Sequence, residues 1–271
     1  MWRVGLFSLV FISSSVSPTL ADQPIMNMMP RWDGGYGIQF FHESYWSNDL
    51  LSGSSRIANP MGLELERHRL RIEGVYTWDK SIRVAFKQPY VWSQRRTIMK
   101  GGKAVTQRNS GWDDFTLILP LKKYFNRDGY SGSWTLAPQV RFPTGSQSGD
   151  FPISDGSWDF ALSAGYEYEN PTWYAAVGAT HWWNNGHEAD LFQLEIDLGW
   201  RLRDNAMILW ETEFDWSRSG ATRIESGPVL YWRFTDTVHT RISWKRDIYQ
   251  KVEGVAPGHG DTFRIGVGFV Y

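Results

Sequence analysis

The last eleven residues, 261–271, alternate strictly between two kinds of side chain. Large apolar side chains occupy every second position, and small or polar side chains occupy the positions between them. The apolar set is Phe263, Ile265, Val267, Phe269 and Tyr271, and the other set is Thr262, Arg264, Gly266 and Gly268. Successive side chains of a β-strand point to opposite faces. We therefore predict a strand with one apolar face and one polar face.

The same alternation recurs along the chain in segments of roughly ten residues, the length expected of a strand that crosses a membrane. We predict twelve such strands, over residues 35–46, 64–78, 81–92, 112–124, 134–142, 157–169, 173–183, 190–202, 206–217, 223–234, 238–247 and 261–271. An even number of antiparallel strands closes into a barrel with both termini on one side.

The connections between these strands differ in length at the two ends of the predicted barrel. Four of them are tight turns, at residues 79–80, 170–172, 203–205 and 235–237, and residues 126–133 form a longer connection on the same side. The connections at the other end are mostly longer, as in residues 47–61, 93–111, 145–156 and 248–260. Short periplasmic turns opposite long outer loops are typical of outer-membrane barrels.

Aromatic residues make up 16% of the chain, including 16 Trp. Indole combines an apolar body with one N–H donor, so it is stable where lipid meets water. The predicted periplasmic belt contains Trp78, Trp134, Trp173, Trp200, Trp210 and Trp232, and the outer belt contains Trp46, Trp92, Trp112, Trp158, Trp182, Trp216 and Trp244. A soluble barrel or sandwich with the same alternation is the competing interpretation.

The N-terminus has the pattern of a cleaved secretory signal. Arg3 precedes an apolar stretch that is too short to span a membrane, and small residues follow up to Ala21. We therefore predict a signal peptide over residues 1–21, a periplasmic leader over 22–33 and the barrel over 34–271. Whether the leader folds into the lumen as a plug is left open by the sequence.

Composition excludes several kinds of chemistry. The chain has no cysteine, so it has no disulfides, thiolate metal ligands or thiol nucleophiles. The formal charge of −1 and the lack of a basic run predict no nucleic-acid partner. The partners that remain are outer-membrane lipid and a small-molecule solute.

The inward faces of the predicted strands carry charge unevenly. The basic side chains Arg67, Arg69, Arg71, Arg83 and Lys87 lie on the second and third strands, the acidic side chains Glu195, Asp197, Glu211, Glu213 and Asp215 lie on the eighth and ninth, and Arg141 and Arg241 are secondary candidates. In a ring of twelve strands these two groups face each other. A backbone diameter of roughly 24 Å leaves a lumen on the order of 10 Å, close to a Debye length. We expect the groups to contact a solute, with a narrow or plugged lumen as the alternative.

Motifs for hydrolysis are absent or incomplete. Gln147 replaces the nucleophile of a G-x-S-x-G elbow, and no H-E-x-x-H zinc motif occurs. His42 and Ser44 resemble the His-x-Ser of outer-membrane phospholipases, but no asparagine partner follows them, so we predict no enzyme. A loop that contains His181, His187, Glu188 and Asp190 fixes no metal geometry, and we predict neither a metal nor another cofactor.

Three short stretches resemble the outer-membrane barrel family named for the meta-pathway of phenol degradation. They are Gly111-Trp112-Asp113-Asp114 leading into Lys122-Lys123-Tyr124, then Phe142-Pro143-Thr144-Gly145, then Gly156-Ser157-Trp158-Asp159, and Gly227-Pro228 also fits the family. The first stretch departs from the usual Gly-x-Gly-Asp. Membership implies transport of small molecules, aromatic or hydrophobic compounds among them, across the outer membrane.

The C-terminal strand also resembles the last strand of bacterial outer-membrane barrels, whose terminal aromatic residue is recognised by the barrel-assembly machinery. Phe269 and Tyr271 are the residues that would make this contact. We therefore predict an all-β, closed, antiparallel transmembrane barrel in the outer membrane of a Gram-negative bacterium. We expect a passive channel, with a lipid hydrolase or a structural or adhesion barrel with a plugged lumen as alternatives.

Overall fold

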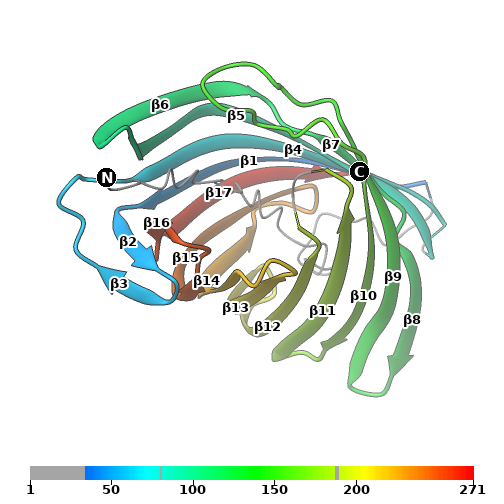
Figure 1. Cartoon of the computed structure of the whole chain (residues 1–271). Coiled ribbons are helices and arrows are strands. Elements are labelled where there is room, and N and C mark those ends of the chain that lie inside the picture. Colours follow the sequence, from blue (N-terminus) through cyan, green and yellow to red (C-terminus); the bar gives the residue numbers. More distant parts are fainter. Residues whose placement is uncertain (1–33, 80, 187–188) are drawn as a thin grey trace, which may run out of the picture.

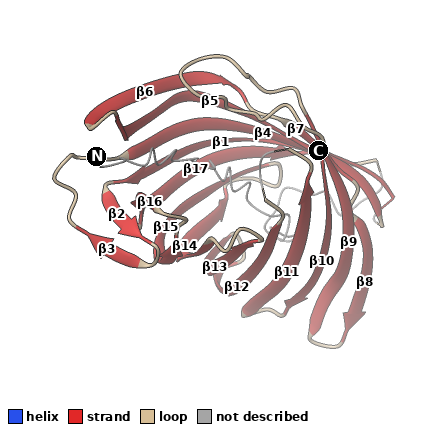
Figure 2. Cartoon of the chain, viewed as in Figure 1, coloured by secondary structure: helices blue, strands red, loops and turns tan. Residues whose placement is uncertain are grey.

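A computed structural model describes residues 34–79, 81–186 and 189–271, and every regular element in them is a β-strand (Figure 2). Within these ranges no helix is long and apolar enough to cross a membrane. The wall strands are β1 (Tyr36–Ser47), β4 (Leu65–Asp79), β5 (Ile82–Lys100), β7 (Phe115–Ile118), β8 (Leu121–Arg127), β9 (Tyr130–Phe142), β10 (Asp159–Glu169), β11 (Trp173–Asn184), β12 (Leu191–Arg203), β13 (Ala206–Ser217), β14 (Thr222–Arg233), β15 (Val238–Lys251) and β17 (Asp261–Val270).

These strands form one closed antiparallel ring (Figure 1). Sequential neighbours pair around the wall, and β1 pairs with β17 to close it, with Gln39 opposite Gly268. The short strands β7 and β8 occupy one position between β5 and β9, so the ring has twelve positions. Closure pairs the backbone of every wall strand on both sides, which a strand in lipid requires. The predicted fold class and strand number are confirmed.

The break between β7 and β8 departs from the single strand that we predicted over residues 112–124. Pro120 has no N–H to donate to a ladder, so it interrupts the strand. Both pieces still pair with β9, because Ile118 lies opposite Gln139 and Leu121 lies opposite Leu136. The carbonyl of Pro120 accepts a hydrogen bond from the backbone N–H of Arg83 on β5, at 3.2 Å. The wall is therefore continuous across the break.

Alternation along the strands separates an apolar outside from a largely polar inside. All the tryptophans predicted for the periplasmic belt are exposed, as are those predicted for the outer belt except Trp182. Trp182 is 4% exposed, and its indole N–H donates to Gln193 inside the barrel, at 3.2 Å. Its neighbour Trp183 takes the outward position instead, with 45% exposure. The prediction for Trp182 was wrong by one residue. In a strand, a shift of one residue moves a side chain to the opposite face of the sheet.

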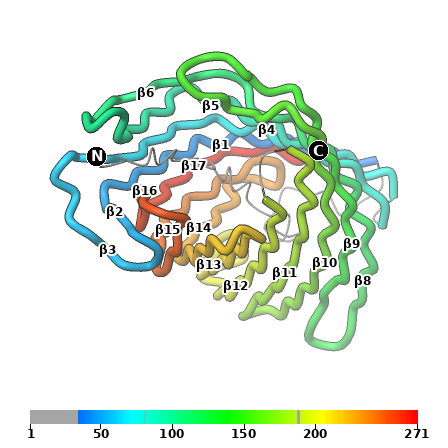
Figure 3. The backbone as a smooth tube through the Cα atoms, viewed as in Figure 1, coloured from blue at the N-terminus to red at the C-terminus, as the bar shows by residue number. Residues whose placement is uncertain are grey.

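The long connections lie at the end of the barrel opposite the C-terminus (Figures 1 and 3). There β2 (Asp49–Ser52), β3 (Ser55–Ile57) and β16 (Val255–Gly258) form a small separate sheet. Residues 93–111, which we predicted to be a loop, instead extend β5 into a hairpin with β6 (Lys103–Trp112). We assign this end to the cell exterior, because outer-membrane barrels have long extracellular loops.

The connections at the other end are short throughout. The connection that we predicted over residues 126–133 is only the pair Asp128 and Gly129, because β8 and β9 continue almost to the turn. Gly129 has a φ of 82°, a value that glycine adopts without strain. The predicted signal peptide (1–21) and leader (22–33) lie outside the described residues.

Candidate functional site in the barrel interior

All the charged residues predicted to face the lumen lie on inward positions of the wall strands. Arg67 and Lys87 are half-buried. The buried members are Arg69, Arg71, Arg83, Arg141, Glu195, Asp197, Glu211, Glu213, Asp215 and Arg241. The strand alternation therefore located these side chains correctly, while their role toward a solute stays a prediction.

The basic group is neutralised by an acidic residue that we did not predict. Glu43 on β1 lies between β4 and β17 and is 2% exposed. Its carboxylate is 2.6 Å from Arg69 Nε, 3.5 Å from Arg71 Nη1 and 2.8 Å from Arg264 Nη2. Arg71 also pairs with Glu73, at 2.5 Å. The contacts from Arg264 to Glu43 and from Arg71 Nη2 to Glu73 are charge-assisted hydrogen bonds, and those from Arg69 and Arg71 to Glu43 are ion pairs.

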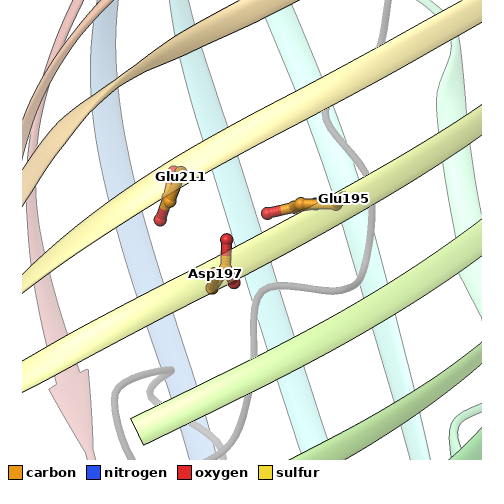
Figure 4. A group of neighbouring side chains, drawn as sticks. All are labelled: Glu195, Asp197 and Glu211. Atoms are coloured by element: carbon orange, nitrogen blue, oxygen red, sulfur yellow. The ribbon is translucent and has the colours of Figure 1, made fainter.

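The acidic group is likewise neutralised from neighbouring strands. Glu195, Asp197 and Glu211 point toward one another from β12 and β13, with carboxylate oxygens within 4.8 Å (Figure 4). Glu211 forms ion pairs with Arg241 and with Lys245, whose Nζ is 3.2 Å from Glu211 Oε2. Oxygen clusters of this kind suit hard cations, but here two protein cations already compensate Glu211. This grouping is therefore part of an ion-pair network.

A third set of charges joins the two groups along β14 and β15. Arg223 pairs with Glu225 and, at 2.5 Å, with Asp247 Oδ1. The Tyr45 hydroxyl donates to Asp247 Oδ2, at 3.2 Å, which links this set to β1. The basic and the acidic group are therefore not two surfaces of a single sign. Each contains paired charges of the other sign, and we call this arrangement of both signs the charge mosaic. Glu43, Arg223, Glu225, Lys245, Asp247 and Arg264 share the inward alternation, which is the signal that could have identified them.

The interior also contains two apolar clusters that we did not predict. One is formed by Tyr174, Ala176, Met207, Leu209, Val229 and Tyr231, on β11, β13 and β14. The other is formed by Val75, Ala85, Ile118 and Ala137. Both lie toward the ends of their strands that adjoin the short turns. The inner surface is thus charged toward the exterior and partly apolar toward the periplasm.

The three sequence stretches that resemble the phenol-pathway family meet at the outer end of the barrel, except for Lys122-Lys123-Tyr124, which lie on β8 near the short turns. Asp114 accepts hydrogen bonds from the Gly145 N–H and from the Ser154 hydroxyl, both at 2.8 Å. The N–H of Phe115 donates to Thr144 Oγ1, at 2.9 Å. Burial raises the pKa of Asp114, and the two hydrogen bonds that it accepts act in the opposite direction.

A row of rings also joins these stretches. Phe142 lies 5.8 Å from Phe115 and 4.8 Å from Trp158 between ring centroids. We name the contacts among Asp114, Phe142, Gly145, Ser154 and Trp158 the loop cluster. It joins the loops that follow β6 and β9 to the start of β10.

The loop that contains His181 was the other region considered for a metal. His181 lies on the outward face of β11 against Trp183, with ring centroids 4.6 Å apart. Asp190 accepts from the backbone N–H of Asn184 and pairs with Arg218. His187 and Glu188 lie outside the described residues.

A closed ring of antiparallel strands with an apolar outside and charged networks inside defines an outer-membrane β-barrel. The family model described as "Putative MetA-pathway of phenol degradation" matches residues 62–271, and the chain belongs to this family. The family resemblance found in the sequence is thereby confirmed.

Solved structures show the same fold. The crystal structure of an outer membrane channel from Pseudomonas putida F1 has a TM-score of 0.74 and 13% identity, with 92% of this chain and 99% of that chain covered. The KdgM porin in complex with disordered oligogalacturonate has a TM-score of 0.51 and 9% identity, with coverage of 86% and 98%. No curated protein matches this sequence.

Proposed function

We propose that the protein is a passive channel that carries small molecules across the outer membrane. The observation that carries this proposal is the closed wall with its buried mosaic of paired charges on the inward face. A solute inside such a barrel would meet both cations and anions, while the outside presents apolar side chains to lipid. The fold shared with solved outer-membrane channels supports the same conclusion.

Arg67 is the residue that we assign to first contact with the solute. Arg69 and Arg71 lie on the same face of β4, but both are within ion-pairing distance of Glu43. The Nε of Arg67 is buried without a hydrogen-bond partner. A guanidinium with unused donors binds carboxylates and other planar anions well.

Small aromatic compounds with a polar or anionic group are the solute class that we infer. Their polar end would pair with Arg67, and their ring would pass the apolar cluster around Tyr174 and Tyr231. The family's connection with phenol degradation agrees with this class. The role of the other interior charges is to keep the passage hydrated and its wall strands in register.

Planar-bilayer recording of the full-length protein tests the channel. We expect discrete conductance steps, and Arg67→Glu should shift the reversal potential in a salt gradient toward cation selectivity. Arg203→Glu, an equal charge change at the exposed last residue of β12, is the matched control and should leave the potential unchanged. Benzoate added to one side should reduce the ion current of the wild type more than that of Arg67→Glu.

The possible results separate the candidate functions. Conductance without a change in selectivity in Arg67→Glu would keep the channel but remove Arg67 as the contact. A folded protein with no conductance would contradict the channel and favour a structural or adhesion barrel.

A further inference from the structure

Ser44 lies between two histidines on the outside of the barrel. Its Oγ is 3.0 Å from His42 Nε2 and 2.9 Å from His68 Nδ1. The other ring nitrogen of His68, Nε2, is 2.9 Å from Glu66 Oε1. The ladder between β1 and β4 places Ser44 directly opposite His68 and Trp46 opposite Glu66, so the backbone brings these residues together. We name Ser44, His68 and Glu66 the outer triad.

The outer triad lies on the membrane side of the wall, at the level of the outer tryptophans. Ser44 alternates with the buried side chains of Glu43 and Tyr45, which face inward. Ser44 pairs with Phe263, and Phe263 pairs in turn with Trp244, which is 46% exposed. Exposed tryptophans mark the boundary between lipid headgroups and acyl chains. The triad therefore faces the depth at which the ester bonds of membrane lipids lie.

Trp92 fixes the two imidazole rings at this position. Its ring meets the ring of His42 edge-on at 5.2 Å and that of His68 at 6.2 Å, between centroids. The two imidazoles are nearly parallel, at 8°, with centroids 6.0 Å apart. Packing of this kind restricts rotation of both rings, so their nitrogens stay directed at Ser44.

The acceptor and donor roles in the outer triad follow from the carboxylate. An ionised Glu66 only accepts hydrogen bonds, so the proton between it and His68 is on His68 Nε2. In the neutral imidazole the other nitrogen, Nδ1, is then an acceptor, so the hydroxyl of Ser44 donates to it. The resulting order is hydroxyl to imidazole to carboxylate. This is the polarity that activates a serine nucleophile, with the two ring nitrogens exchanged relative to the usual arrangement.

Arg95 holds the carboxylate end of this chain of hydrogen bonds. Its Nη2 is 2.7 Å from Glu66 Oε2 and 3.3 Å from Glu64 Oε1. Glu66 therefore uses one oxygen for Arg95 and the other for His68. The guanidinium favours the ionised form of Glu66, which the assignment above requires.

We propose that the outer triad is a hydrolytic site for fatty-acyl esters of membrane lipids. Ser44 Oγ attacks the ester carbonyl while its proton moves to His68 Nδ1, and a tetrahedral oxyanion forms. As the carbonyl re-forms, the ester C–O bond breaks and the leaving alcohol takes the proton from His68. Water then attacks the acyl-serine, with His68 again accepting the proton and returning it to Ser44 Oγ. The products are a fatty acid and a deacylated lipid.

His42 has a separate role in this site. Since the Ser44 hydroxyl hydrogen is directed at His68, the short contact with His42 requires His42 Nε2 to carry a hydrogen and donate to Oγ. When Oγ becomes bonded to the acyl carbon, this donor is free to bond the carbonyl oxygen as it gains negative charge. We assign His42 to stabilisation of the oxyanion.

The His-x-Ser pattern singles out His42 and Ser44, but it does not reveal the outer triad, because His68 and Glu66 are distant from Ser44 in the chain. His68 and Glu66 come from the neighbouring strand, 24 and 22 positions further along the chain. None of these residues lines the interior, so the proposed channel does not use them. The two functions can therefore succeed or fail independently.

Covalent labelling of the purified full-length protein in detergent micelles tests the nucleophile. We expect an alkyl fluorophosphonate to modify one serine, which peptide mass spectrometry should identify as Ser44. Ser44→Ala should abolish labelling, and His68→Asn should slow it by about 100-fold or more, because it removes the general base. His181→Asn is the matched control. His181 also faces outward and packs beside a tryptophan, but the described contacts include none between His181 and a serine. It should label at the wild-type rate.

Glu66 acts through His68 and does not contact the ester, so its role is tested by asking whether a conservative substitution restores the labelling rate. Glu66→Gln should slow labelling by about tenfold, and Glu66→Asp should restore part of the loss because it keeps the anion. A purely structural role would instead affect both variants alike. Folding of each variant is checked by the shift in gel mobility on heating.

Hydrolysis in vesicles identifies the lipid. Phosphatidylethanolamine vesicles and vesicles containing lipid A are each incubated with wild-type protein and with Ser44→Ala, and released fatty acid is measured. If wild-type protein releases fatty acid from one of these lipids and Ser44→Ala does not, the proposal is supported. The lipid that is hydrolysed identifies the source of the ester. Folded wild-type protein that neither reacts with the fluorophosphonate at Ser44 nor releases fatty acid would overturn it, whatever the conductance.

Discussion

Glu43 and Arg264 form an ion pair that joins the first wall strand to the last. Arg264 donates to Glu43 Oε2 from Nη2 at 2.8 Å and from Nε at 3.1 Å, across 221 positions of sequence. Glu43 is 2% and Arg264 is 6% exposed. The pair lies beside the β1–β17 ladder that closes the barrel, so a side-chain contact reinforces the backbone closure.

The first prediction concerns the stability of this closure. Glu43→Ala leaves Arg69, Arg71 and Arg264 close together without the carboxylate that all three face. Removing one partner of a buried ion pair costs about 3–5 kcal/mol, because the remaining charge is desolvated without compensation. We expect a loss of this size in the free energy of unfolding, measured by guanidinium titration in micelles with tryptophan fluorescence.

An exposed ion pair supplies the control. Arg218 pairs with Asp190 at 3.4 Å, and its side chain is 81% exposed. Arg218→Ala should change the free energy of unfolding by only ~0–1 kcal/mol, as exposed pairs do. Equal midpoints for Glu43→Ala and the wild type would show that the closure does not depend on Glu43.

Much of the wall could be predicted from the sequence because a membrane strand must alternate. The lipid face tolerates few polar residues, so a period of two persists through each span and locates it. The break at Pro120 and the extra length of β5 were missed for different reasons. A proline can sit within a wall when neighbouring strands supply other bonds, and the β5–β6 hairpin extends beyond the membrane, where alternation has no lipid to enforce it.

The interior was harder to predict than the wall. Alternation shows that Arg69 and Glu211 face inward, but it does not show which charges they meet. Glu43 reaches Arg264 only because the ring closes, and Lys245 reaches Glu211 from two strands away. Such pairing depends on strand order, register and side-chain length together, which no local pattern of residues contains.

The second prediction concerns Gly227 in β14, next to Pro228. A Cβ atom built on Gly227 would lie 2.1 Å from the carbonyl oxygen of Trp244, a backbone atom that cannot turn away. Gly227→Ala should therefore force β14 and β15 apart and cost about 1–3 kcal/mol, the usual range for an overpacked site. Guanidinium unfolding in micelles measures the loss.

A second wall glycine serves as the matched control. A Cβ on Gly165 would lie 3.4 Å from the nearest atom, the carbonyl oxygen of Val177, which is ordinary contact. Gly165→Ala should therefore leave the free energy of unfolding unchanged or raise it slightly, since alanine reduces the conformational entropy of the unfolded chain. A loss equal to that of Gly227→Ala would contradict the steric explanation.

The third prediction is a pH dependence from Asp114 in the loop cluster. Because burial raises the pKa of Asp114, the folded protein binds this proton more tightly than the unfolded chain does. Protonated Asp114 therefore stabilises the folded protein at pH values below the pKa that Asp114 has in the unfolded chain. This stabilisation is lost as the pH rises through the raised pKa of Asp114 in the folded protein. Asp114→Asn removes the titration, so the wild type should lose stability relative to this variant as the pH is raised from about 3, below the ordinary pKa of an aspartate, towards neutrality.

Unfolding midpoints measured across this pH range test the sign of the effect. The exposed turn residue Asp236 provides the comparison, and Asp236→Asn should give a curve parallel to that of the wild type. A wild-type protein that instead gains stability over Asp114→Asn as the pH rises would show that the hydrogen bonds from Gly145 and Ser154 outweigh burial.

The last prediction concerns the charge balance of the acidic part of the interior. Lys245 Nζ lies 3.2 Å from Glu211, 3.8 Å from Glu213 and 3.9 Å from Glu225, so one cation serves three carboxylates. Lys245→Gln keeps much of the side-chain length but removes that charge. Because the carboxylates would then attract mobile cations, the reversal potential in a salt gradient should shift toward cation selectivity. Lys251→Gln, at an exposed end of the same strand, should shift it far less. Equal shifts in the two variants would mean that permeating ions sense the net charge of the protein and not the local network around Lys245.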